Sequence, residues 1–326
     1  MGKISRKLKT LLLQVKNFGS GIAFAELKSA IFKTPQASYK RYEKIKNYLR
    51  AKYSDVIDRY AQLQYVFDET GGGCIDCSCP IWIFWYQGIE NAPDIVKMCT
   101  ESVKRNAHDH PVILIDKDNY KDYVNIPEHI LSKINEGKIS LTHFSDILRF
   151  NLLADHGGIY LDSTVFVTND SGEDVFDWSK YSLYTCHTEI RPETDVAKGA
   201  WVSYIFATSK GNPFAKYMVD MFNAYWVKEN MLITYLMIDC MIAIAYEEIP
   251  WAKEMIDAVP PNNCEIYELA QNANSIYADE LYKKAISCPF HKLTYKKEFY
   301  TDRDGQETIW GRFTKDFVKE IIINIQ

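Results

Sequence analysis

The chain has 326 residues, of which 47% are hydrophobic and 25% are charged, as in an ordinary folded globular protein. We find no apolar run of 18 residues and no secretory signal, so we expect a cytoplasmic protein whose eight cysteines are thiols. The net charge of −5 is unevenly spread: residues 1–53 carry 13 basic and two acidic side chains, and the remainder carries 25 basic and 41 acidic ones. The acidic remainder argues against nucleic acid as a partner.

The first segment, residues 3–19, has the pattern of a basic amphipathic helix, and 40–66 is also predicted to be helical. A basic amphipathic helix can lie on an anionic membrane surface. The alternative is a helix that packs on its own domain with a solvated basic face. We therefore expect residues 1–70 to form a helical extension, with 1–19 holding the protein peripherally on the inner face of the membrane, ahead of one domain over 71–326.

From residue 72, apolar runs alternate with helical patterns. The predicted strands are 80–86, 111–115, 159–168 and 199–208. The predicted helices are 91–107, 127–136, 142–155, 213–228, 234–248, 251–258 and 275–285, and the last ten residues fit either a helix or a strand. This alternation predicts an α/β fold, a Rossmann-like sheet with helices on both faces.

The stretch 145–164 brings charged side chains and glycines together. Asp146 and Arg149 are three residues apart, so they share one face of a helix. Gly157 fits the end of that helix, and Gly158 permits a tight entry into the next strand. Asp162 stands where this strand ends. Because ligands of open α/β sheets bind beyond the carboxyl ends of strands, we expect the helix face and Asp162 to belong to one site.

The pattern SDxxR at 145–149, followed by GGxYxD at 157–162, resembles the sugar-binding region of DxD-type glycosyltransferases. The form DST at 162–164 is most similar to bacterial capsular polysaccharide synthesis proteins. The resemblance extends to IWIFWYQG at 81–88 and HKLTYK at 291–296. It implies a GT-A fold and transfer of a sugar from a nucleoside diphosphate sugar, with a UDP-sugar expected, to a lipid-linked or polysaccharide acceptor. It also implies Mn²⁺ or Mg²⁺ as cofactor and retention of the anomeric configuration.

The same resemblance implies residue roles. Asp146, Arg149 and Asp162 would be catalytic, and Asp162 and His291 would bind the metal. The residues that would hold the donor are Trp85, Gln87, Asp146, Arg149, Tyr160, Thr164 and Trp310. Trp85 would stack on the base. The Trp310 expectation comes from composition: Trp310 stands in a polar, Gly-containing stretch, which fits a loop that closes over the diphosphate. Each has a structural alternative: Trp85 can be ordinary core, and a lone histidine such as His291 is often structural.

The sequence departs from the full DxD pattern at Thr164, which stands where a second acid would share the cation. A diphosphate can supply missing oxygen ligands to Mg²⁺, so a metal is still expected. The same departure leaves a second hypothesis open, a degenerate transferase that serves as a partner in a polysaccharide assembly complex. Two further features stay ambiguous: Asp239, which can face the site or make a buried contact, and the three cysteines of 74–79, which lack a fourth zinc ligand.

Overall fold

The computed structural model describes residues 3–65, 73–169, 172–188 and 195–318. The helices of this part are α1 (Lys3–Phe18), α2 (Ser20–Phe32), α3 (Pro35–Lys52), α4 (Ser54–Ala61), α5 (Asp94–Asn106), α6 (Glu128–Asn135), α7 (Leu141–His156), α8 (Pro213–Lys228), α9 (Met237–Glu248), α10 (Pro250–Asp257), α11 (Glu268–Asn272), α12 (Asp279–Ala285) and α13 (Ile309–Phe313). The strands are β1 (Ile81–Phe84), β2 (Val112–Ile115), β3 (Gly158–Asp162), β4 (Val165–Val167), β5 (Leu183–Thr185), β6 (Ile205–Thr208), β7 (Phe290–Lys292), β8 (Asp302–Arg303) and β9 (Gln306–Glu307).

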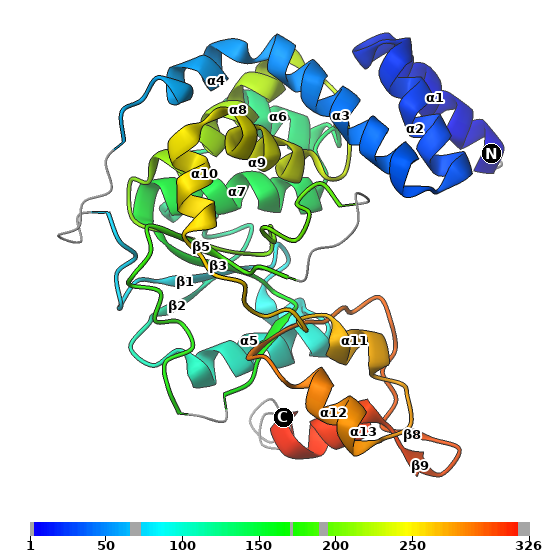
Figure 1. Ribbon diagram of the computed structural model, residues 1–326, viewed down its shortest axis with the longest axis vertical. Helices are drawn as coiled ribbons and strands as arrows, with labels where there is room; N and C mark the ends of the chain where they lie inside the picture. Colours follow the sequence, from blue (N-terminus) through cyan, green and yellow to red (C-terminus); the bar gives the residue numbers. More distant parts are fainter. Residues whose placement is uncertain (1–2, 66–72, 170–171, 189–194, 319–326) are drawn as a thin grey trace.

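The central sheet is mixed and has the order β2-β1-β3-β6-β5. β1 runs parallel to β2 and β3, and β6 runs antiparallel to β3 and β5. Alternate strand residues point to opposite faces, so Trp82 and Tyr160 join one hydrophobic cluster while Ile81 and Ile159 join another. Helices α7 to α10 lie over the first face and α5 over the second (Figure 1). The predicted mixed α/β fold with helices on both faces is confirmed.

Several predicted boundaries differ from the structure. The run expected as one strand over 159–168 breaks at Ser163 and Thr164 into β3 and β4, and β4 pairs with β7 in a separate two-stranded sheet. The strand expected over 199–208 is limited to β6. Strands β5, β7, β8 and β9 were missed, because two or three residues are too few to show a periodicity. Helices α2, α11 and α13 were also not predicted. Of the last ten residues, 319–326 lie outside the described part.

The helical extension divides into two parts. Helices α3 and α4 pack against α9 and α8, and Tyr42, Leu49 and Ile57 belong to the same hydrophobic cluster as the core of the main domain. The structure therefore does not separate these helices from the domain expected to begin at residue 71. Helices α1 and α2 form a hairpin that packs on α3 through α2 and extends away from the sheet (Figure 1). No helix of the described residues is long and apolar enough to cross a bilayer.

Candidate active site

The predicted corner forms between α7 and β3. Ser140 caps α7, its hydroxyl accepting a hydrogen bond from the backbone N–H of His143, and the helix ends at Gly157. Gly157 and Gly158 have φ angles of 69° and 98°, a region that favours glycine. A Cβ on Gly158 would lie 2.4 Å from the carbonyl oxygen of Pro80. The two glycines therefore let the chain turn close to β1 and place α7 beside the end of β3.

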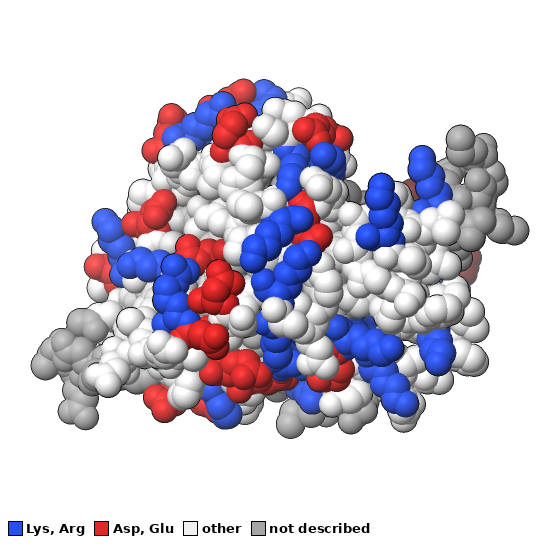
Figure 2. All heavy atoms as spheres, turned by 90° about the horizontal axis from the view of Figure 1, so that it is seen from above, with Lys and Arg blue, Asp and Glu red and all other residues white. Residues whose placement is uncertain are grey.

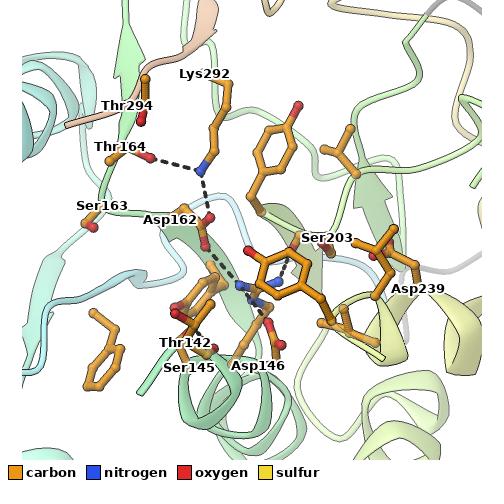
Figure 3. Close-up of a pocket in the computed structure, with 18 of the residues that line it drawn as sticks. Thr142, Ser145, Asp146, Asp162, Ser163, Thr164, Ser203, Asp239, Lys292 and Thr294 are labelled. Carbon is orange, nitrogen blue, oxygen red and sulfur yellow. Dashed lines mark hydrogen bonds and ion pairs between the residues drawn. The ribbon is translucent and has the colours of Figure 1, made fainter. Parts of the chain in front are cut away.

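A cavity of about 760 Å³ opens at the carboxyl ends of β1 and β3. This volume suits an organic ligand larger than a single sugar. Most of the predicted site residues line this cavity: Trp85, Gln87, Asp146, Arg149, Tyr160, Asp162 and Thr164. Figure 3 shows Asp146 and Asp162 on opposite sides of a central guanidinium, with Lys292 above and Asp239 to one side. The predicted meeting of the α7 face with the end of β3 is confirmed by this geometry.

Arg149 is the centre of the site and is almost fully buried. Its Nη2 donates to Oδ1 of Asp162 at 2.9 Å and lies 3.5 Å from Oδ1 of Asp146, while Nη1 donates to the carbonyl of Ser203. The guanidinium carbon lies 4.5 Å from the ring centre of Tyr160, whose ring is buried below it. Tyr160 thus supports Arg149 from beneath, and Arg149 holds the two carboxylates at a set separation.

Lys292, at the end of β7, completes the cationic side of the pocket. Its Nζ donates to Oδ2 of Asp162 at 2.6 Å and to the hydroxyl of Thr164 at 2.9 Å (Figure 3). Burial raises the pKa of Asp162, but the charges of Lys292 and Arg149 outweigh that effect and hold the pKa below its usual value. Asp162 is therefore an anion with a cation on each oxygen.

Asp146 is held by a chain of hydrogen bonds that reaches into the core. The indole N–H of Trp226 donates to Nε2 of His143 at 3.0 Å, so this nitrogen must accept. The proton of a neutral His143 then sits on Nδ1, which lies 3.3 Å from Oδ2 of Asp146 and donates to it. The sequence gave no sign of the contact with Trp226, because Trp226 is on α8 and reaches His143 only in the folded chain.

Asp239, at the start of α9, lines the acidic side of the pocket. Burial, followed by the charge of Asp195, raises the pKa of Asp239 to about 7. One carboxylate oxygen accepts a hydrogen bond from the indole N–H of Trp201 at 3.2 Å. The structure thus places Asp239 in the pocket, where its carboxyl changes charge near neutral pH.

Two aromatic rings border the mouth of the pocket. Trp85 follows β1 and meets Tyr295 edge to face, with ring centres 5.5 Å apart. The indole N–H of Trp85 is buried and has no hydrogen-bond partner in the described part of the chain. A buried donor without a partner costs free energy, and a ligand with an oxygen acceptor would remove that cost. The Trp85 side chain is half-buried, and Gln87, also in the pocket lining, is exposed. The Trp85 indole N–H can therefore serve a bound ligand.

Two predicted site residues, His291 and Trp310, lie outside the pocket. His291 is fully buried, its Nε2 hydrogen-bonded to the hydroxyl of Thr168 at 2.9 Å, and its ring packs against Phe313. Trp310 is also buried, between Phe299 and Phe313. Neither lines the pocket. The metal role expected for His291 and the donor-binding role expected for Trp310 are not supported by these positions, because both side chains fill the core around α13.

The residues present do not fit the Mn²⁺ or Mg²⁺ site that the resemblance implied. Both oxygens of Asp162 are already paired with cations, and the Thr164 hydroxyl accepts from Lys292. Across residues 3–65, 73–169, 172–188 and 195–318, no group of three His, Cys, Asp or Glu side chains is arranged to hold a metal ion. A divalent cation at Asp162 would also stand beside two positive charges, which repel it.

The residues that sequence reasoning missed come from two places. Lys292 and Tyr295 lie within the HKLTYK segment that carried the resemblance, and the resemblance implied a role for His291 alone in that segment. Strand alternation could have shown that His291 and Lys292 point to opposite sides, had the short strand β7 been recognised. His143 stands one turn before Asp146 on the same helix, a spacing that was visible in the sequence.

Comparisons with known proteins identify the family of the chain. The family model for "Capsular polysaccharide synthesis protein" matches residues 28–312. The chain is 28% identical over 162 residues to an O-glycosyltransferase, braB, of Annulohypoxylon truncatum; this match covers 45% of the chain and 37% of that protein, so it spans little over a third of the relative's length. No solved structure matches the chain significantly. The mixed α/β fold is consistent with a GT-A-like glycosyltransferase.

The family match covers well over half of the chain and includes every residue of the pocket described above. Together with the glycosyltransferase relative, it supports a transferase role at the general level. The chain therefore belongs to the capsular polysaccharide synthesis protein family.

Proposed function

We propose that this protein transfers a sugar from a nucleoside diphosphate sugar, with a UDP-sugar expected, to a glycan acceptor. The observation that carries the proposal is the convergence of Asp146, Arg149 and Asp162 in one cavity of about 760 Å³. The cavity has a cationic side at Lys292 and an acidic side at Asp239 (Figure 3). A ligand with an anionic middle and a hydroxyl-rich end matches that division.

The separation of a cationic side from an acidic side suggests how the nucleoside diphosphate sugar lies in the pocket. Trp85 and Tyr295 provide aromatic surface for the base, and the unpartnered indole N–H of Trp85 can donate to an oxygen of the nucleoside. The diphosphate would lie by the Lys292 end. The sugar would then reach Asp146 and Asp239, whose carboxylates accept hydrogen bonds from hydroxyl groups.

The proposed reaction exchanges one bond at the anomeric carbon. The bond from this carbon to the β-phosphate oxygen breaks, and its electron pair leaves with the nucleoside diphosphate, which gains one negative charge. The acceptor hydroxyl oxygen forms the new bond, and its proton passes to a phosphate oxygen. This path needs no dedicated base and is expected to retain the anomeric configuration. Arg149 and Lys292 stabilise the charge that develops on the leaving group.

The test combines donor hydrolysis with variants of Asp162. A panel of nucleoside diphosphate sugars should reveal slow hydrolysis of one donor without an acceptor. Asp162→Asn should lower this rate by about 100- to 1,000-fold, since removing one charge that organises the reacting groups has effects of this size. The control is Asp155→Asn, which changes an exposed carboxylate on the same helix α7. Absence of binding and hydrolysis with every donor would overturn the proposal.

A second candidate function is a partner protein in polysaccharide assembly that retains the pocket without catalysis. Thr164 in place of an acid, and the full pairing of Asp162 with cations, favour it. In cells, Asp162→Asn at normal protein abundance separates the two. Loss of polymer supports catalysis, and unchanged polymer supports the partner role.

We further propose that the acceptor is lipid-linked or a growing polysaccharide, and that the protein works in the cytoplasm on the inner face of the membrane. The helix pair α1–α2 supports this proposal, and α2 adds to the segment 1–19 that the sequence suggested. Residues 3–32 contain one acid, Glu26, which is paired with Arg41. Over residues 9–32, the large apolar side chains that are exposed are Leu12, Leu13, Val15, Phe24, Leu27, Ile31 and Phe32.

Lysines lie beside part of this apolar surface. Lys28, Lys40 and Lys44 line a cavity of about 340 Å³ together with Phe24 and Phe32. Figure 2 shows this end of the molecule, on the right, as mostly uncharged surface with blue side chains near its edge, while the acidic residues gather over the rest of the face. Apolar side chains bordered by lysines are what an anionic lipid surface binds.

Vesicle sedimentation tests the membrane proposal. The protein should pellet with vesicles of phosphatidylcholine and phosphatidylglycerol and less with phosphatidylcholine alone, since anionic lipid attracts the lysines. The double variant Ile31→Asp/Phe32→Asp should lose about tenfold or more of this binding. Val227→Asp, which changes an equally exposed residue on α8, should bind as the parent does. Equal pelleting of the double variant would contradict the proposal.

A further inference from the structure

Lys292 holds the two residues at which a DxD-type enzyme is expected to hold its cation. Its ammonium bonds Asp162 at 2.6 Å and Thr164 at 2.9 Å, the first and third residues of the DST sequence. Three contacts place it there. Lys292 pairs with Val165 in the β7–β4 ladder, its own N–H donates to the carbonyl of Ile266, and the N–H of Leu293 donates to the carbonyl of Thr164.

Lys292 has one hydrogen-bond donor left for a ligand. An ammonium has three N–H donors, and two of them are used by Asp162 and Thr164. The side chain is 19% exposed and lines the pocket, so the third donor can reach an oxygen of a bound molecule. Lys296 adds a second positive charge on the same rim. A compact positive charge of this kind is well suited to phosphate oxygens.

We propose that the ammonium of Lys292 takes the place of the divalent cation and neutralises the diphosphate of the donor. This inference rests on the proposed function and names the group that performs one part of it. When the anomeric carbon–oxygen bond breaks, the electron pair leaves on the β-phosphate oxygen, and Lys292 donates a hydrogen bond to the oxygen that gains the charge. Donor binding and transfer then proceed without Mn²⁺ or Mg²⁺.

A purely structural role makes a different prediction. If Lys292 only neutralised Asp162, the double variant Asp162→Asn/Lys292→Met, which removes both charges, would keep the parent's preference for a phosphorylated ligand. The readout that separates the two is therefore the ratio of the affinities for a nucleoside diphosphate and for its nucleoside, measured on folded protein. The double variant is needed because Asp162 without Lys292 beside it repels a diphosphate but not a nucleoside.

The experiment uses calorimetric titration of the full chain with UDP, GDP, CDP and ADP and with the matching nucleosides, in EDTA and then in Mg²⁺ or Mn²⁺. The parent protein should bind one nucleoside diphosphate equally well in both conditions. Lys292→Met should lower that affinity about 10- to 100-fold, the size expected for a hydrogen bond to a charged group, while nucleoside affinity stays the same. Lys292→Arg keeps the charge and should recover part of the loss.

Lys297→Met is the matched control, because Lys297 is exposed, follows five residues later and lies outside the residues that line the pocket. It should bind as the parent does. Two results would overturn the inference while leaving the transferase proposal intact: nucleotide binding that is lost in EDTA, or an Asp162→Asn/Lys292→Met protein whose affinity ratio equals that of the parent. A parent protein that binds no nucleotide under either condition would overturn both proposals.

Discussion

Two regions of the molecule line the same pocket and hold their side chains by different means. The corner between α7 and β3 places Asp146, Arg149 and Asp162 through local geometry, a helix face followed by two glycines and a short strand. The segment that begins at β7 contributes Lys292 through pairing with β4. The corner therefore depends on backbone shape at two residues, and the β7 segment depends on register, since a shift of one residue would exchange His291 and Lys292.

The largest effect is expected at the corner itself. Gly158→Ala would place a Cβ 2.4 Å from the Pro80 carbonyl at a φ of 98°, so we expect a loss of at least about 2 kcal/mol of unfolding free energy and loss of donor binding. Urea unfolding measures the first and calorimetry the second. The control is Gly21→Ala in α2, where no atom lies within 4 Å of the added Cβ and stability should not fall. Equal stabilities of the two variants would show that the corner is not constrained as described.

A smaller effect is expected from His291, the buried neighbour of Lys292. His291→Phe leaves the hydroxyl of Thr168 without its ring partner and should cost about 1–2 kcal/mol, with nucleotide affinity unchanged. Thermal unfolding and calorimetry provide the two readings. If affinity falls with stability intact, His291 acts on the ligand, and the contrast between the two adjacent residues is lost.

The same residue gives a pH test. Burial lowers the pKa of His291 from its ordinary 6.5 to about 3. Between these values the unfolded chain binds a proton that the folded chain does not, so stability must fall as pH drops from about 6.5 toward 3. His291→Phe removes this group, so its stability should decline less steeply over that range. Parallel pH profiles of the two proteins would contradict the assignment.

Asp239, on the acidic side of the pocket, is like Lys292 in that contacts with residues distant in the sequence hold it in place. Burial raises the pKa of Asp239 to about 7, so above that pH the folded protein holds an unfavourable charge, and stability falls as pH rises from about 4 to 7. Asp239→Asn keeps an acceptor for Trp201 and should raise stability at pH 8 by on the order of 1 kcal/mol, with little change at pH 4. Melting temperatures of both proteins at pH 4 and pH 8 provide the check. If the variant and the parent differ by the same amount at both pH values, the assignment is refuted.

The smallest effect concerns the support of Asp146. His143→Leu removes the link between Trp226 and Asp146, so Asp146 is held less firmly, and affinity for the nucleoside diphosphate sugar should fall about two- to tenfold. Affinity for the nucleoside diphosphate alone should stay unchanged, because Asp146 is expected to meet the sugar. A loss shared equally by both ligands would place Asp146 elsewhere in the site.

Features that depend on residues close together in the sequence were predicted correctly, and features that depend on distant residues were not. The fold class, the helix over 142–155 and the gathering of Asp146, Arg149 and Asp162 depend on periodicity and turn residues within about twenty positions, which a pattern can show. The short strands β5 and β7 could not be predicted, because each has three residues and gains its stability from pairing partners far along the chain.

For the same reason the sequence could not place the metal ligand expected at His291 or the donor-binding residue expected at Trp310. A motif shows which residue types are present, and both His291 and Lys292 are plausible partners for a site with Asp162. Trp310 likewise has the composition of a ligand-binding loop but packs with Phe313 in the core. Only burial separates these cases, and burial results from the packing of several elements.

The sequence by itself determined the helix, glycine turn and strand that carry Asp146, Arg149 and Asp162, because local backbone preferences and an i, i+3 spacing suffice for that. Only the tertiary structure decided which cation meets Asp162. Lys292 is 130 positions away, and the pairing of β7 with β4 turns its side chain toward the pocket and that of His291 into the core. Such a pairing is set by the whole domain, because each short strand is stable only when its neighbours are in place.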